Sequence, residues 1–136
     1  MSAIRMNIVD LHPFIDSQIS RINRYSSESE KETLTIVFIK AEIGTISEIV
    51  YMLQDNLRDA DVIFHKDDYF FLVLPETDST GGLHIEEVLK EFLDRKDLSV
   101  GIATLPEDGK TKESLLDSLQ AVCQSSFNID LKDYIY

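Results

Sequence analysis

Apolar residues recur at helical spacing near the start of the chain. Between Leu11 and Tyr25 they form one stripe, which predicts an amphipathic helix with Pro13 tolerated in its first turn. The polar stretch "SSESEKE" that follows contains no apolar residue and predicts a linker. We therefore expect an N-terminal helix and linker over residues 1–30 and a folded domain over 31–136. The stripe could pack on the chain's own sheet or on a second copy in a homodimer, since its pattern is the same in both cases.

The folded part begins with a continuous β-branched run, "TLTIVFIKAE", which is typical of a strand covered on both faces. Helical spacing predicts a helix from about Thr45 to Arg58. The stretch "VIFHKDDYFFLVLP" then holds two apolar runs, Val62 to Phe64 and Tyr69 to Leu74. The turn between them is too short for a crossover helix, so the two strands must pair antiparallel.

Three further elements follow: a helix carrying Ile85, Val88, Leu89, Phe92 and Leu93, a strand "LSVGIATLP", and a helix around Leu115 to Val122 with Thr111 as its cap. The order predicts an α+β fold with a ferredoxin-like β-α-β-β-α-β core, an extra helix at each end, and an antiparallel sheet with helices on one face. A doubly wound fold is the alternative, but the hairpin argues against it. The tail "FNIDLKDYIY" reads as an edge strand or a loosely docked end.

Composition excludes several classes of partner. The 136 residues, 43% of them hydrophobic, suit one globular domain. Lys and Arg number 13 against 25 Asp and Glu, and the net charge of −12 argues against nucleic-acid and membrane partners. No apolar run approaches a membrane span and no secretory signal is evident, so we expect a cytoplasmic protein. The single cysteine, Cys123, is expected to be a buried hydrophobe.

Two stretches carry a family resemblance. From Asn56 onwards, "NLRDADVIFHKDDYFFLVLPETD" and the later "LSVGIATLPEDGKTKESLLDSLQAVCQSS" resemble the GGDEF family of diguanylate cyclases. The family layout fits the chain from Thr33 to Ser126. The resemblance implies the nucleotide-cyclase fold, a place in bacterial signalling and a connection with cyclic di-GMP.

The signature hairpin of that family has changed in this chain. With Pro75 as the anchor, Phe70 takes the place of the family's Phe and Asp68 that of its Asp, but Tyr69 replaces the Glu. Lys66 and Asp67 stand where the family has two glycines, and the turn is one residue short. Side chains there would fill the space that the triphosphate needs. The resemblance thus implies an acidic turn in place of a catalytic hairpin.

The other catalytic groups expected from the resemblance are also missing. Lys40 stands where a carboxylate should hold magnesium, and Glu42 could coordinate only with a shift of register. The guanine-binding loop is absent because Gly44 leads almost directly into the helix. Ser126 replaces a Lys expected to meet phosphate. We therefore predict no catalytic residue, no bound metal and no cofactor.

One motif keeps the family pattern. Arg58-Asp59-Ala60-Asp61 resembles the Arg-x-x-Asp inhibitory site that binds cyclic di-GMP, although a local cap or ion pair is the more ordinary interpretation. We expect a catalytically inactive GGDEF-like domain that regulates or binds an unidentified protein partner. A cyclic di-GMP receptor acting through Arg58 and Asp61, and an enzyme with residual nucleotide activity, are the alternatives.

Overall fold

The computed structural model describes residues 4–25, 33–41, 46–93 and 98–135. Its strands are β1 (Ile4–Asn7), β2 (Leu34–Lys40), β3 (Val62–Lys66), β4 (Tyr69–Pro75) and β5 (Ser99–Leu105). Its helices are the 3-10 helix η1 (Ile8–Asp10) and the α-helices α1 (Leu11–Tyr25), α2 (Ile46–Asn56), α3 (Ser79–Leu93), α4 (Lys112–Phe127) and α5 (Lys132–Ile135). No helix in these four ranges is long and apolar enough to cross a membrane.

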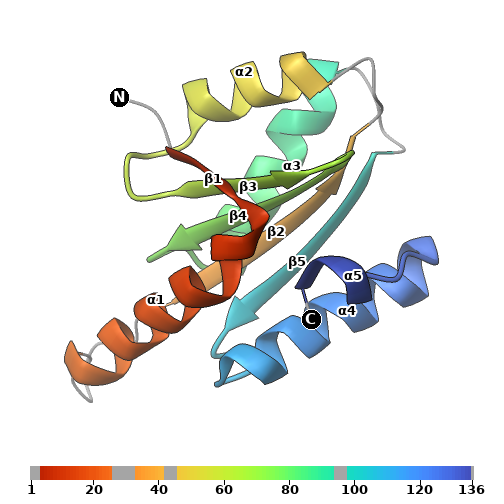
Figure 1. Cartoon of the computed structure of the whole chain (residues 1–136). Helices are drawn as coiled ribbons and strands as arrows, with labels where there is room; N and C mark the ends of the chain where they lie inside the picture. The colour runs from red at the N-terminus through yellow and green to blue at the C-terminus, as the bar shows by residue number, and fades with distance from the viewer. Residues whose placement is uncertain (1–3, 26–32, 42–45, 94–97, 136) are drawn as a thin grey trace.

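The strands form one sheet in the order β1-β3-β4-β2-β5 (Figure 1). From β2 to β5 the chain runs β-α-β-β-α-β, and every pairing within this core is antiparallel. The predicted α+β, ferredoxin-like core is therefore confirmed. β1 adds a parallel strand beside β3, in register from Ile4 opposite Val62 to Asn7 opposite His65.

Helices cover both faces of the sheet. α2 and α3 pack on one face, as expected for the core. α1, α4 and α5 cover the other face, so the expected one-sided layout holds only for α2 and α3 (Figure 1). β2 lies between the two layers, and each of its residues from Leu34 to Ile39 is fully buried. The continuous apolar run predicts this two-sided burial.

The apolar stripe of α1 packs on the sheet of its own chain. Leu11 and Ile15 are fully buried and Ile22 is 6% exposed. The ring of Phe14 lies 5.8 Å from that of Phe64 on β3. At the surface, Lys112 on α4 donates to Asp16 at 2.9 Å. The apolar stripe of α1 thus packs against the core of its own chain. A homodimer through this helix stays a prediction.

The two ends of the chain differ from the sequence interpretation. No strand was expected at Ile4–Asn7, yet β1 extends the sheet there. The prediction for the tail was wrong, because the tail forms α5, with Leu131 and Ile135 fully buried in the core. A hydrogen bond between His12 Nε2 and the Ile135 carbonyl also ties it to α1. A single helical turn is too short for its periodicity to be read. The predicted linker lies outside the described residues, so a boundary at residue 30 stays a prediction.

Helix α4 begins and packs as its sequence indicates. Thr111 accepts a hydrogen bond from the Ser114 N–H at 3.1 Å, and Ser114 Oγ accepts one from the Thr111 N–H at 3.0 Å, which confirms the cap. Gly101 on β5 lets the helix approach, since a Cβ there would lie 3.0 Å from Cys123 Sγ. Burial raises the pKa of the Cys123 thiol to about 12, so this side chain acts as a neutral, buried hydrophobe.

The packing of α1 predicts a large stability effect at Ile15. Ile15→Ala should lower the free energy of unfolding by about 2–5 kcal/mol, because it removes buried methyl groups and leaves a cavity. The control is Val9→Ala at a side chain that is 75% exposed, which should change stability by less than about 0.5 kcal/mol. Urea unfolding monitored by circular dichroism measures both. Equal, small effects would contradict the packing of α1 on the sheet.

Candidate functional site

The two regions singled out by the sequence lie at opposite ends of the β3–β4 hairpin. Lys66 pairs with Tyr69, which leaves Asp67 and Asp68 as the two-residue turn. Arg58 and Asp61 precede Val62, at the other end of β3. The chain therefore does not bring them together into one site (Figure 1).

The backbone of the turn is bonded within the chain. Asp67 adopts a left-handed conformation with φ 57°, which Asp tolerates better than most residues. Its carbonyl lies 2.6 Å from His65 Nε2. The Asp68 carbonyl accepts a hydrogen bond from the Ala41 N–H at 2.7 Å, which ties the turn to the end of β2. Contacts with His65 and with Ala41 therefore hold the turn from two sides.

Aromatic rings pack where the resemblance to GGDEF proteins would place the signature Glu. The ring of Tyr69 lies 5.1 Å from Phe38 and 4.5 Å from Tyr134 of α5. Tyr134 donates its hydroxyl to Asp67 Oδ2 at 3.2 Å, and the Lys66 ammonium lies 5.2 Å from the centre of the Tyr134 ring. We call these five residues the tip cluster. The packed side chains of this cluster lie on the side of the turn that faces α1, α4 and α5.

Both phenols of the tip cluster stay protonated at neutral pH. Burial raises the pKa of Tyr69, and the negative charge of Asp68 raises it further. The pKa of Tyr134 is raised by burial and by its hydrogen bond to Asp67. Tyr69 is therefore neutral, whereas the resemblance to GGDEF proteins would place a carboxylate at this position.

Phe70 lies on the other face of the sheet. It is fully buried, and its ring stacks on that of His65 with centroids 4.4 Å apart and planes 13° apart. Tyr69 and Phe71 point to the opposite side, as the alternation along a strand predicts. His65 therefore packs against the hairpin and bonds its turn.

The described residues of the tip do not fit a magnesium ion. Lys40, which is exposed, ends β2 directly opposite Tyr69, and its ammonium would repel a dication. Asp67 already accepts a hydrogen bond from Tyr134. Within the described ranges no group of three His, Cys, Asp or Glu side chains is arranged to hold a metal. Glu42 and Gly44 lie outside the described residues.

At the other end of the hairpin, Arg58 and Asp61 form a connected set of hydrogen bonds. Asp61, only 3% exposed, accepts from the Arg58 N–H at 2.8 Å and from Arg58 Nη2 at 3.0 Å. The same Nη2 donates to Thr77 Oγ1 at 2.9 Å and to the Pro75 carbonyl. The hydrogen bond to Asp61 raises the pKa of Arg58. Arg58 thus joins the segment after α2 to Pro75 at the end of β4 and to Thr77 in the loop before α3.

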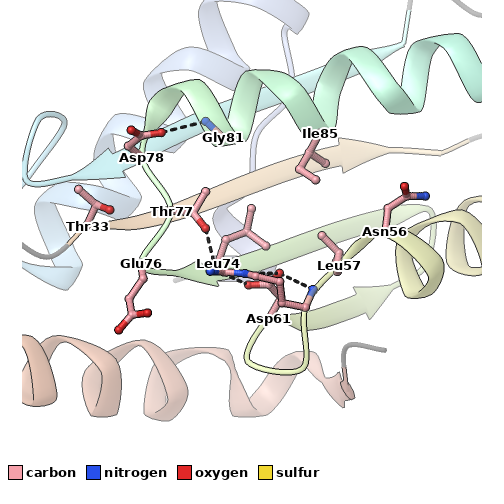
Figure 2. A pocket seen from close by; sticks show the side chains of 11 residues that line it. Thr33, Asn56, Leu57, Asp61, Leu74, Glu76, Thr77, Asp78, Gly81 and Ile85 are labelled. Atoms are coloured by element: carbon pink, nitrogen blue, oxygen red, sulfur yellow. Dashed lines mark hydrogen bonds and ion pairs between the residues drawn. The ribbon is translucent and has the colours of Figure 1, made fainter. Parts of the chain in front are cut away.

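This set of bonds forms one wall of a cavity of about 510 Å³, a size that suits a small ligand. Its lining includes one cation, Arg58, and three carboxylates, from Asp61, Glu76 and Asp78. Figure 2 shows Glu76 pointing toward α1, where Arg21 lies 3.9 Å from it, and Asp78 accepting from the Gly81 N–H at 2.9 Å. The charged side chains of the lining are therefore mainly acidic.

Several contacts at these two places were not predicted. Two hydrogen-bond partners of Arg58, Pro75 and Thr77, are 17 and 19 residues away from it in sequence. Tyr134 is 67 residues from Asp67. No local spacing indicates such contacts, because they depend on strand register and on the docking of the tail.

Comparisons with known proteins were made at the levels of sequence and structure. No protein-family model and no curated protein matches the chain. Solved structures do match. The structure of a DGC protein from Thermotoga maritima has a TM-score of 0.63 at 20% identity, over 85% of this chain and 92% of that one.

Two further structures share the fold. A sensory box/GGDEF family protein from Caulobacter crescentus has a TM-score of 0.62 at 14% identity, over 90% of this chain and 93% of that one. The diguanylate cyclase SiaD from Pseudomonas aeruginosa, solved in complex with its activator SiaC, has a TM-score of 0.55 at 13% identity. There the match covers 85% of this chain and 55% of that one. The chain therefore has the fold of GGDEF, or diguanylate cyclase, domains.

The bonding at Asp61 predicts a local stability effect. Asp61→Ala should lower the free energy of unfolding by about 1–3 kcal/mol, because it leaves the part-buried Arg58 N–H without its acceptor. The ion pair between Arg58 and Asp61 contributes little to the free energy of unfolding, since the Arg58 side chain is 51% exposed. The control is Asp55→Ala at an exposed position of α2, with an expected change below about 0.5 kcal/mol. Thermal and urea unfolding compare the two, and equal stabilities would contradict a structural role for Asp61.

Proposed function

We propose that this chain is a catalytically inactive GGDEF-like domain that serves as a regulatory or protein-interaction module in bacterial signalling. The observation that carries the proposal is the tip cluster, where Tyr69 stands in the place of the family's Glu and packs under Tyr134. A protein partner is consistent with SiaD, a protein of the same fold that was solved with its activator. A cytoplasmic location is part of the proposal.

The chemistry of phosphoryl transfer supports an inactive domain. Such a reaction depends on metal ions, cations and exact positioning of the phosphates acting together. At the tip, Lys40 occupies the place expected for a metal-binding carboxylate, and Asp67 would face the phosphates with negative charge. Lys66 and Asp67 also carry side chains where the family's glycines leave room. These features act against binding of both the metal and the triphosphate.

The proposal predicts no cyclase activity. Incubation with GTP and magnesium or manganese should give no cyclic di-GMP above a blank without protein, measured by chromatography and mass spectrometry. The same assay with each other nucleoside triphosphate addresses residual nucleotide activity. An active diguanylate cyclase in the same buffer is the positive control. Turnover that disappears in Asp68→Ala would contradict the proposal.

A cyclic di-GMP receptor is the second candidate, because Arg58 and Asp61 lie together on the wall of a cavity of suitable size. The bonding argues against it. Arg58 Nη2 is already shared among Asp61, Thr77 and Pro75, and Asp61 accepts from Arg58 itself. A dianion would also meet Glu76 and Asp78. One charge-assisted contact contributes about 1.5–3 kcal/mol, whereas micromolar affinity needs about 8 kcal/mol.

We therefore predict no saturable heat when cyclic di-GMP is titrated into tens of micromolar protein in a calorimeter. Arg58→Ala and, as a control distant from the cavity, Lys132→Ala are titrated in parallel. A micromolar isotherm that persists in Lys132→Ala and vanishes in Arg58→Ala would reverse the ranking of the two candidates.

A further inference from the structure

The outer edge of β1 lacks a strand partner among the described residues. Among the described strands, β1 lies at the end of the sheet and pairs with β3 alone. Alternate residues of such a strand direct their N–H and C=O groups outward, where another strand can bind them. On β1, Arg5 and Asn7 are exposed.

Exposed apolar side chains flank this edge. Val9, just after β1, is 75% exposed and Tyr51 on α2 is 71% exposed; they are the most exposed large hydrophobic residues in the described part of the chain. A cavity of about 300 Å³ lies between Arg5 and one side of α2, with Ile46, Val50 and Tyr51 in its lining. Figure 1 shows β1 beside α2 at this outer edge. An apolar depression therefore adjoins an unpaired strand edge.

The charged residue that lines this cavity, Arg5, is opposite in sign to the net charge of the chain. Arg5 makes no ion pair with any described residue. The other residues that line its cavity, Ile46, Ser47, Val50, Tyr51 and Gln54, include no carboxylate. The net charge of −12 acts at a distance and is screened beyond about 8 Å at physiological salt. At contact, an exposed Arg beside apolar walls favours a partner that carries both a carboxylate and an apolar side chain.

We propose that the β1 edge and the adjoining side of α2 form a docking site for an extended, acidic segment of a partner protein. The segment adds a strand to the sheet at β1, places an apolar side chain in the cavity beside Tyr51, and pairs a carboxylate with Arg5. This inference rests on the proposed role as an interaction module and names the surface used. A second copy fits less well, since symmetric pairing would bring Arg5 near Arg5.

Selection from a displayed library of random ten-residue peptides against the full chain tests the proposal. Enriched peptides should combine alternating apolar residues with Asp or Glu. Synthetic versions of them, measured by fluorescence anisotropy, should bind at least tenfold more weakly to Arg5→Glu and to Tyr51→Ala. Leu83→Ser on α3, at a side chain that is 52% exposed, is the matched control and should bind as the wild type does. All three changes lie at exposed positions, and circular dichroism checks that each variant folds.

Hydrogen exchange supplies the structural readout. A bound peptide should slow exchange of the amides in residues 4–9, because those facing outward gain acceptors. Failure to enrich peptides, equal binding to all variants, or no slowing at β1 would contradict the proposal. A dimer in light scattering that Tyr51→Ala dissolves would assign the surface to a second copy and also overturn it. Measured cyclase turnover would instead contradict the proposed function and would not contradict the proposed docking site.

Discussion

The structure depends on the burial of β2 from both sides. Leu34 to Ile39 are all fully buried, so each face of the sheet requires its own layer of apolar side chains. α2 and α3 supply one layer and α1, α4 and α5 supply the other. Because the second face needs α5, the tail must dock with Leu131 and Ile135 inside. That docking places Tyr134 over the hairpin turn, so the core packing determines what surrounds the altered signature.

At the hairpin turn, packed side chains lie where the resemblance to GGDEF proteins would place a catalytic signature. A signature hairpin must leave its backbone open to a triphosphate, whereas this turn is bonded to Ala41, His65 and Tyr134. Tyr69 faces the aromatic layer that includes Phe38, where a carboxylate would be costly to bury. The substitution of Glu by Tyr and the docking of the tail are thus consistent with each other.

Much of this could be predicted from the sequence, and the failures have physical causes. The hairpin followed from the short spacing between two apolar runs, and α1 from its stripe. The face that α1 covers could not be predicted, because an amphipathic pattern is the same for any apolar partner. β1 has four residues that include Arg5 and Asn7, and α5 is a single turn, so neither shows a periodicity. The Arg-x-x-Asp motif was recognised, but its bonds to Pro75 and Thr77 depend on tertiary structure.

The central claim is that the hairpin turn no longer accepts a nucleoside triphosphate with its metal. A titration of the 15N-labelled chain with a non-hydrolysable GTP analogue and magnesium, followed by two-dimensional NMR, tests it most directly. The amide resonances of residues 66–70 and of Ala41 are expected to stay in place up to millimolar ligand. Saturable shifts of those resonances, abolished by Asp68→Ala, would show that the turn still binds nucleotide.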